Sequence, residues 1–330
     1  MAYRYIPMMK TKAGEITALS NLPALSRSRI LPLLHVCENV SPSFAKELAI
    51  AWSGNLAGVD GSFNFIHSGS STAFTALVVA MRNGGIATVP SFGPSDPVTY
   101  QQFARAMVDG HGALIKVSVG NIPSVPAWLW AQGISPSVVD LVVDLKHIAF
   151  VDLSSYAGYI TSVLQQNALS LVQYRSVTLA SAAAPKDHTS LQYGANRVAR
   201  TDWLLWSAVS PTTSFQLDYG DYLTGHPDLT EPPGVAMASA TVSARYTLDA
   251  EWLIIKGRST NGPHGQPMGQ QYIAHAGLIS SDPGFSGVIG SWADSQIMQA
   301  AAGAPKMGSR GKWSGFAANR HLWLVADRLP

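Results

Sequence analysis

The chain has 330 residues, of which 47% are hydrophobic and 13% are charged, and its formal net charge is +2. The charged share is about half of the roughly 25% that is typical of globular proteins, which excludes a chain disordered by excess charge. So mild a net charge does not by itself indicate nucleic-acid binding. The single cysteine, Cys37, excludes an intrachain disulfide and a zinc site built from thiolates.

The first twelve residues carry Arg4, Lys10 and Lys12 within a short apolar run, unlike a secretory signal, which needs a continuous apolar stretch after its basic end. The longest apolar runs fall well short of the roughly 18 residues that a membrane-spanning helix requires. We therefore expect a cytoplasmic protein without a membrane partner.

Short apolar runs rich in β-branched residues alternate with longer stretches of helical periodicity, such as Phe44, Leu48 and Trp52 at a spacing of four. In chain order, this pattern predicts strand Tyr5–Met9, helix Gly14–Leu22, strand Ile30–Val36, helix Ser43–Ser53, strand Leu56–Phe65, helix Ser71–Asn83, strand Ile86–Pro90, helix Thr99–Asp109, strand Ala113–Val119, a partial helix in Ile134–Asp140, strand Leu141–Lys146, helix Ser155–Asn167, strand Leu171–Leu179, helical character over Thr189–Val209, and strand Ser214–Leu217.

Strands that alternate with helices indicate a parallel sheet covered by helices. Eight such units within about 220 residues favour a (β/α)8 barrel. An open doubly wound sheet remains the alternative, although no predicted strand is followed by the GxGxxG turn of a dinucleotide-binding sheet.

The pattern changes after the eighth strand. A proline-rich connection, Pro227–Gly234, leads to a predicted β-hairpin over Ala244–Lys256. Three amphipathic helices follow, at Gln270–Leu278, Trp292–Ala301 and Gly315–Asp327. We interpret residues 1–226 as the barrel and residues 227–330 as a C-terminal elaboration of hairpin and helices packed on it.

A parallel barrel carries its site at the carboxyl ends of its strands, so polar residues there are the candidates for chemistry. Paired carboxylates could perform acid–base catalysis or bind a hard metal ion, and we assign this catalytic role to Asp144, Asp218 and Asp221, with Glu38 as a further partner. A cationic cluster could bind an anion such as phosphate, with Lys10, Lys116, Lys146 and Arg175 as its members. Alternation along a strand could instead direct some of these side chains to solvent, and the carboxylates could cap helices.

The sequence contains none of the motifs that identify common catalytic sites. HExxH, GxxxxGK[ST] and a GxSxG elbow are all missing, and the nearest approach to the last is Gly69-Ser70-Ser71. Cofactors and metal content are therefore left unknown by the sequence.

Several short segments, taken together and in order, resemble the beta family proteins of bacteria and phages. The segments are Tyr5-Ile6-Pro7 with Lys10, Lys12 and Gly14-Glu15, then Ile30-Leu31-Pro32-Leu33, Arg200-Thr201-Asp202-Trp203, Gly220-Asp221-Tyr222, Ala244-Arg245-Tyr246, Trp252 to Arg258, Ser291-Trp292-Ala293-Asp294 and Asn319-Arg320-His321-Leu322. The chain departs from the family where His35 replaces a glutamate and where Ala293 replaces a glycine.

The resemblance implies a protein of phages, prophages or bacterial genomes, and it brings no established biochemical activity. It also picks out a recurring polar set as the expected site: Lys10, Lys12, Glu15, Asp221, Tyr222, Arg245, Tyr246, Lys256 and Arg258. Apart from Asp221, which we assign to the catalytic carboxylates, we expect these residues to bind the substrate or an anion, together with Lys146 and Arg175 of the barrel.

Three functions remain open. The first is a recognition module in phage–host conflict that binds a protein or nucleic acid partner. The second is a barrel enzyme acting, with or without a metal, on a phosphorylated or nucleotide-like substrate. The third is a structural component of a virion or multi-protein assembly. An enzyme should have a concave polar pocket at the strand ends, whereas a recognition module should expose a broad apolar patch.

Overall fold

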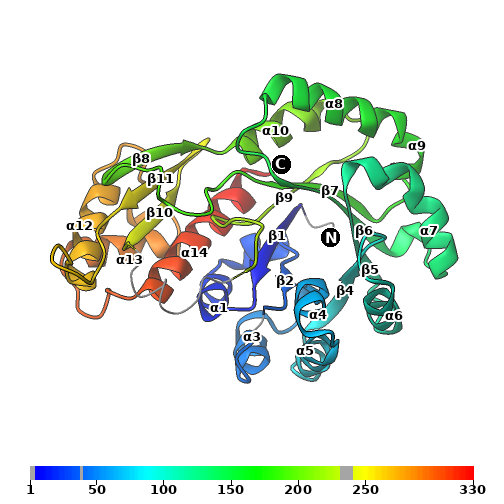
Figure 1. Ribbon diagram of the computed structural model, residues 1–330, viewed down its shortest axis with the longest axis horizontal. Coiled ribbons are helices and arrows are strands. Elements are labelled where there is room, and N and C mark those ends of the chain that lie inside the picture. Colours follow the sequence, from blue (N-terminus) through cyan, green and yellow to red (C-terminus); the bar gives the residue numbers. More distant parts are fainter. Residues whose placement is uncertain (1–3, 38–39, 231–240) are drawn as a thin grey trace.

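The computed structural model describes residues 4–37, 40–230 and 241–330. Eight parallel strands close into a barrel in the order β1-β2-β3-β4-β5-β6-β7-β9 (Figure 1). This arrangement confirms the predicted (β/α)8 barrel over the open sheet. The strands are β1 Tyr5–Lys10, β2 Leu33–His35, β3 Leu56–Asp60, β4 Ala87–Phe92, β5 Ala113–Val117, β6 Val139–His147, β7 Ser176–Ala182 and β9 Asp218–Asp221.

Alternation along the strands divides the core into two layers, because successive side chains of a strand point to opposite faces. Ile6 and Met8 of β1 pack inside the barrel with Leu33 and Val142. Tyr5, by contrast, belongs to the outer layer between strands and helices. This alternation decides which polar residues reach the mouth of the barrel.

Helices surround the barrel and bury one face each, as α3 does through Phe44, Leu48 and Trp52. The helices of this layer are α1 Ala13–Ser20, α2 Ala24–Ser28, α3 Phe44–Trp52, α4 Ser62–Ser68, α5 Thr72–Asn83, α6 Val98–Ala106, α7 Val125–Gln132, α8 Leu153–Gln166, α9 Ala168–Leu171 and α10 Thr201–Val209. None of the helices within the described ranges is both long enough and apolar enough to cross a membrane.

A smaller antiparallel sheet lies beside the barrel, at the left of Figure 1. Its strands β10 (Ser243–Thr247) and β11 (Glu251–Lys256) form the predicted hairpin, and the predicted C-terminal helices follow as α12 (Met268–Ser280), α13 (Trp292–Ala301) and α14 (Arg310–Arg328). The sheet and these helices share a second core. α14 packs against both α1 and β10, so it joins the sheet to the barrel.

Several predicted element boundaries were wrong. The partial helix predicted in Ile134–Asp140 is one 3-10 turn, Pro136–Val138, followed by the start of β6, and helix α7 before it was not predicted. The segment Thr189–Val209 is helical only from Thr201, because Gly194–Ala199 forms β8, which pairs with the apolar edge of β11. Strand Leu56–Phe65 ends at Asp60, and helix α4 follows. The seventh and eighth strands begin at Ser176 and Asp218, later than predicted. Glu38 and the part of Pro227–Gly234 beyond residue 230 lie outside the described residues.

Candidate active site at the barrel mouth

Two barrel strands, β3 and β9, end on an aspartate, and β6 carries one, Asp144, three residues before its end. In each case the carboxylate accepts a hydrogen bond from the backbone N–H two residues later, which is the geometry of an Asx turn. The pairs are Asp60 with Ser62 at 2.8 Å, Asp144 with Lys146 at 3.0 Å and Asp221 with Leu223 at 2.9 Å. These turns fix the loops at the carboxyl ends of β3, β6 and β9.

Asp60 and Asp144 lie on the inward face of their strands, but Asp221 lies on the outward face. Asp221 accepts hydrogen bonds from Tyr5 at 2.7 Å and contacts His321 at 2.6 Å, in the layer between strands and helices. Only two of the three turn aspartates therefore face the mouth of the barrel.

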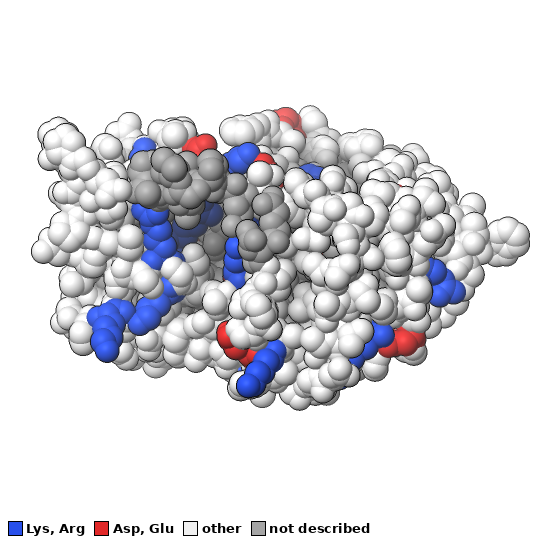
Figure 2. Space-filling view, turned by 60° about the horizontal axis from the view of Figure 1, so that its bottom comes forward, with Lys and Arg blue, Asp and Glu red and all other residues white. Residues whose placement is uncertain are grey.

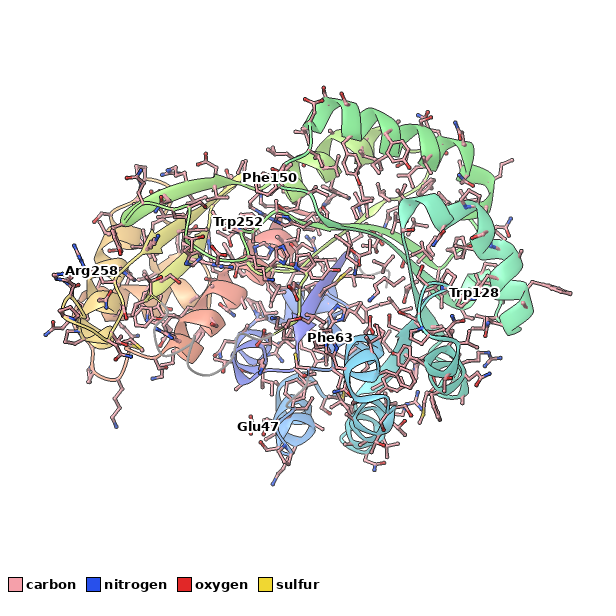
Figure 3. The ribbon with its side chains drawn as sticks, in the orientation of Figure 1. Glu47, Phe63, Trp128, Phe150, Trp252 and Arg258 are labelled. Atoms are coloured by element: carbon pink, nitrogen blue, oxygen red, sulfur yellow. The ribbon has the colours of Figure 1, made fainter. Side chains whose placement is uncertain are left out.

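A cavity of about 460 Å³ opens at this mouth. Its size is within the range of pockets that hold small molecules. Phe63, labelled in Figure 3 on α4, forms part of its wall. The titratable side chains that line it come from the loops and strand ends of the barrel, and they are His35, Asp96, Lys116, Asp144, Lys146, Tyr222 and Asp228.

Lys116 of β5 and Asp60 of β3 form a buried ion pair across the mouth. Burial alone would raise the pKa of Asp60, but the Lys116 ammonium holds that pKa below its usual range. Burial alone would lower the pKa of Lys116, but Asp60 raises it above its usual value. Both partners are therefore charged at neutral pH, and the ammonium faces the cavity.

Asp144, Lys146 and Tyr222 form a second cluster. Asp144 Oδ2 lies 2.7 Å from Lys146 Nζ and accepts a hydrogen bond from the Tyr222 hydroxyl, also at 2.7 Å. Burial would raise the pKa of Asp144, but Lys146 and Lys116 lower it below its usual value. The carboxylate is thus ionised, and it orients a phenol and an ammonium toward the cavity.

His35, at the end of β2, is buried between these two clusters. Its Nδ1 lies 3.5 Å from Asp60 Oδ2, and its ring stacks on Tyr222 with centroids 6.2 Å apart. Among the described residues neither ring nitrogen has a hydrogen-bond partner. Burial lowers the pKa of His35 to about 4, so the imidazole is neutral at pH 7.

Asp96 follows β4 in a loop whose Gly93 N–H donates to the carboxylate at 2.8 Å. Burial, and next the negative charge of Asp60, raise the pKa of Asp96 to about 6. A carboxyl group with a pKa this close to neutrality can both give and take a proton under physiological conditions.

Two non-glycine residues beside the mouth adopt left-handed backbone conformations. Lys146 has φ 59°, and Leu223, directly after Tyr222, has φ 54°. Such conformations are costly for residues with a Cβ and occur preferentially at functional sites. The backbone is therefore locally strained at the ends of β6 and β9, beside Asp144 and Tyr222.

A second, larger cavity of about 770 Å³ lies between the barrel and the C-terminal sheet, and we call it the groove. It gathers five of the residues predicted to bind an anion or substrate: Lys10, Glu15, Tyr222, Arg245 and Lys256. Tyr222 lines both cavities, whereas Lys146 lines only the mouth.

Other predicted site residues lie elsewhere. Asp218 is the first residue of β9 and contacts Arg4 at 3.3 Å. Arg175 directly precedes β7 and forms an ion pair with Asp140 at 2.6 Å. Both residues therefore lie at the end of the barrel opposite the mouth. The expected convergence of Arg175 with the lysines is therefore wrong, because β7 begins after Arg175.

The remaining three predicted residues line neither cavity. Tyr246 is buried in the C-terminal core and donates to Asp294 at 2.8 Å. Lys12 is the N-cap residue of α1. Arg258 is exposed at the outer end of the C-terminal sheet, as Figure 3 shows, and lies over Tyr193.

Asp60 is a residue of the candidate site that sequence reasoning missed. The predicted third strand ran on to Phe65, so that Asp60 was placed inside the strand and not at its end. The signal that could have found it is Val59-Asp60-Gly61, a turn-forming pair directly after an apolar run.

The described residues hold no group of three or more His, Cys, Asp or Glu side chains arranged to bind a metal ion.

A comparison with known proteins agrees with the resemblance drawn from the sequence. The family model described as Beta protein matches residues 5–327, which covers the barrel, the C-terminal sheet and nearly all of α14. No curated protein and no solved structure matches the chain. With a match over almost its entire length, the chain belongs to the Beta protein family.

Proposed function

We propose that this protein is an enzyme that performs acid–base catalysis on a small polar substrate at the mouth of the barrel. The observation that carries the proposal is the 460 Å³ cavity at the strand ends, which Asp96, Lys116, Asp144 and His35 all line. The His35 imidazole has no hydrogen-bond partner among the described residues. A concave pocket with convergent titratable groups of shifted pKa is the feature expected of an active site.

In this proposal Asp96 transfers the proton. Its pKa of about 6 gives it both protonation states near neutral pH, and its hydrogen bond from Gly93 N–H holds it in the loop beside the cavity. Lys116 carries a fixed positive charge that would stabilise negative charge developing on the substrate.

His35 and the Asp144 cluster position the substrate. The neutral imidazole of His35 can donate or accept one hydrogen bond, because neither of its nitrogens is engaged by the described residues. Tyr222 and Lys146 present a hydroxyl and an ammonium that Asp144 orients. Together these groups offer several donors and an acid–base residue around one small volume.

Untargeted mass spectrometry tests the proposal. Wild-type protein is incubated with a bacterial metabolite extract, beside the variants Asp96→Asn and Lys116→Met. Asp249→Asn, which alters a carboxylate that is 81% exposed, serves as the control. We expect wild type and the control to convert at least one metabolite and the two mouth variants to lose roughly 100-fold or more in rate. Conversion that Asp96→Asn retains in full would refute the assignment.

A second candidate is the recognition of a protein or nucleic acid partner in phage–host conflict. It is favoured by Phe150, which is 95% exposed in the loop between β6 and α8 (Figure 3). Exposed aromatic side chains are enriched in protein interfaces, although single exposed hydrophobic residues are common on monomers. A pull-down with wild type and Phe150→Ser separates the two: a stoichiometric partner lost only in the variant would support recognition.

A further inference from the structure

The groove between the barrel and the C-terminal sheet is rich in positive charge. Of its lining residues that the structure describes, five are Lys or Arg and two are Asp or Glu. Figure 2 shows Lys and Arg side chains gathered in and around a hollow on this face of the molecule. The cations come from separate parts of the chain: Lys10, Lys186, Arg245, Lys256 and Arg310.

Arg245, on β10, is the clearest sign of a ligand. Its guanidinium donates to the carbonyl oxygens of Thr224 and Pro185 and contacts His188 Nε2 at 2.9 Å. Within the described ranges no carboxylate pairs with it. Burial lowers the pKa of Arg245 to about 10, so it still carries a full charge at neutral pH. A desolvated arginine without an anionic partner is unfavourable unless a ligand supplies the negative charge.

The side chains around Arg245 fit the same ligand. Lys256 Nζ is held by the carbonyl oxygens of Thr189 and Leu191, at 3.3 and 2.8 Å, which fixes a second positive charge in the wall of the groove. Lys10 reaches the groove from the end of β1. Burial raises the pKa of Glu15 to about 7, so this carboxyl group is only partly ionised and offsets little of the positive charge.

The groove adjoins the mouth of the barrel. Tyr222 and Leu229 line both cavities. A ligand bound at Arg245 therefore lies next to the cavity that Lys116 and Asp96 line. A guanidinium and two ammonium groups are the donors that proteins use for phosphate.

We propose that the groove binds the phosphate groups of an organic phosphate of about nucleotide size, whose other end reacts at the barrel mouth. Only the reaction of the other end at the barrel mouth rests on the proposed function. The phosphate site itself depends on Arg245, Lys10 and Lys256, and it can be tested without turnover.

Isothermal titration calorimetry with inorganic pyrophosphate and with ADP tests the site in the full chain. The variants are Arg245→Met and Lys10→Met, both in the groove. Lys46→Met, on the exposed face of α3, is the matched control for the loss of one positive charge. Because Arg245 also holds two loop carbonyls, circular dichroism first establishes that its variant is folded, and Lys10→Met carries the test if it is not.

We expect both phosphates to bind wild type and Lys46→Met equally, and to bind each groove variant roughly tenfold or more weakly. Binding is measured without turnover, so failure of the mouth assignment would leave this result unchanged. Wild-type affinity in both groove variants, or no binding of either phosphate to wild type, would overturn the proposal. Tight binding of a 20-nucleotide single strand together with no binding of pyrophosphate or ADP would also overturn it, in favour of a nucleic acid.

Discussion

His321 Nε2 on α14 lies 2.6 Å from Asp221 Oδ2 at the end of β9, and the other ring nitrogen of His321 lies 3.0 Å from the Thr247 hydroxyl on β10. The order of carboxylate, imidazole and hydroxyl is that of a hydrolytic triad. All three residues are fully buried and none lines either cavity. Asp221, which the sequence predicts as catalytic, here joins the barrel to the C-terminal sheet.

Replacing His321 should destabilise the whole protein. In His321→Leu the Asp221 carboxylate would stay buried with fewer partners, and we expect the free energy of unfolding to fall by about 3 kcal/mol. Urea denaturation measures the change. Arg197→Ala, which removes ion pairs from a side chain that is 47% exposed, should cost about 1 kcal/mol or less. Equal losses in the two variants would contradict the linking role of His321.

The Lys116–Asp60 pair gives a second stability prediction. Lys116→Met should lower the free energy of unfolding by roughly 3 to 5 kcal/mol, because Asp60 would remain buried without its counter-charge. The double variant Lys116→Met/Asp60→Leu should recover most of that loss, since no buried charge is left unpaired. A double variant less stable than Lys116→Met would show that Asp60 is held mainly by its other contacts, including Ser62.

Ionisation of Asp96 should lower the free energy of unfolding of the protein at neutral pH. Its folded pKa of about 6 is above the value of an unfolded aspartate, so the folded state binds more protons between about pH 4 and 6, and stability falls as pH rises through that window. Asp96→Asn keeps an oxygen for Gly93 N–H and cannot ionise. We expect this variant to be more stable than wild type at pH 8, by on the order of 2 kcal/mol, and the difference to vanish below about pH 4.

Thermal denaturation of the Asp96→Asn and wild-type proteins from pH 4 to 8 measures that difference, and groups common to both proteins cancel. A difference that stays constant with pH would mean that Asp96 has an ordinary pKa in the fold.

His35 should remain neutral across the physiological range. Its pKa of about 4 is below that of an unfolded histidine, so the unfolded state binds more protons between about pH 4 and 6.5, and this residue adds stability as pH rises through that window. NMR of the imidazole nitrogens should show no titration of His35 between pH 5.5 and 8. Titration near pH 6.5 would indicate an imidazole open to water.

The barrel was predictable from sequence because its strands are short apolar runs at regular intervals, and most of the mouth followed from counting the polar residues after them. Lys116, Asp144 and Lys146 were found in this way. Asp60 was missed, since Phe63 and Phe65 have high strand propensity. Packing places them in α4 instead, and Phe65 contacts Tyr100 there.

Errors of four or five residues in the boundaries of the seventh and eighth strands explain the other failures. Asp218 and Asp221 were placed after the eighth strand, but they are the first and last residues of β9. Because they are three positions apart, their side chains point to opposite faces of the strand. Arg175 was placed inside a strand that it precedes. The family resemblance picked out several residues of the groove, among them Lys10, Arg245 and Lys256. The groove itself could not be predicted, because it depends on how α14 and β8 bring the C-terminal sheet against the barrel.

The most direct test of an acid–base site is the exchange of substrate protons with solvent. Wild type and Asp96→Asn are incubated with the metabolite extract in heavy water, and deuterium uptake is followed by mass spectrometry. The proposed function predicts that at least one metabolite gains deuterium with wild type and that uptake falls by roughly 100-fold or more with Asp96→Asn. Equal uptake with both proteins, or none above the protein-free control with wild type, would contradict a proton-transfer site at the barrel mouth.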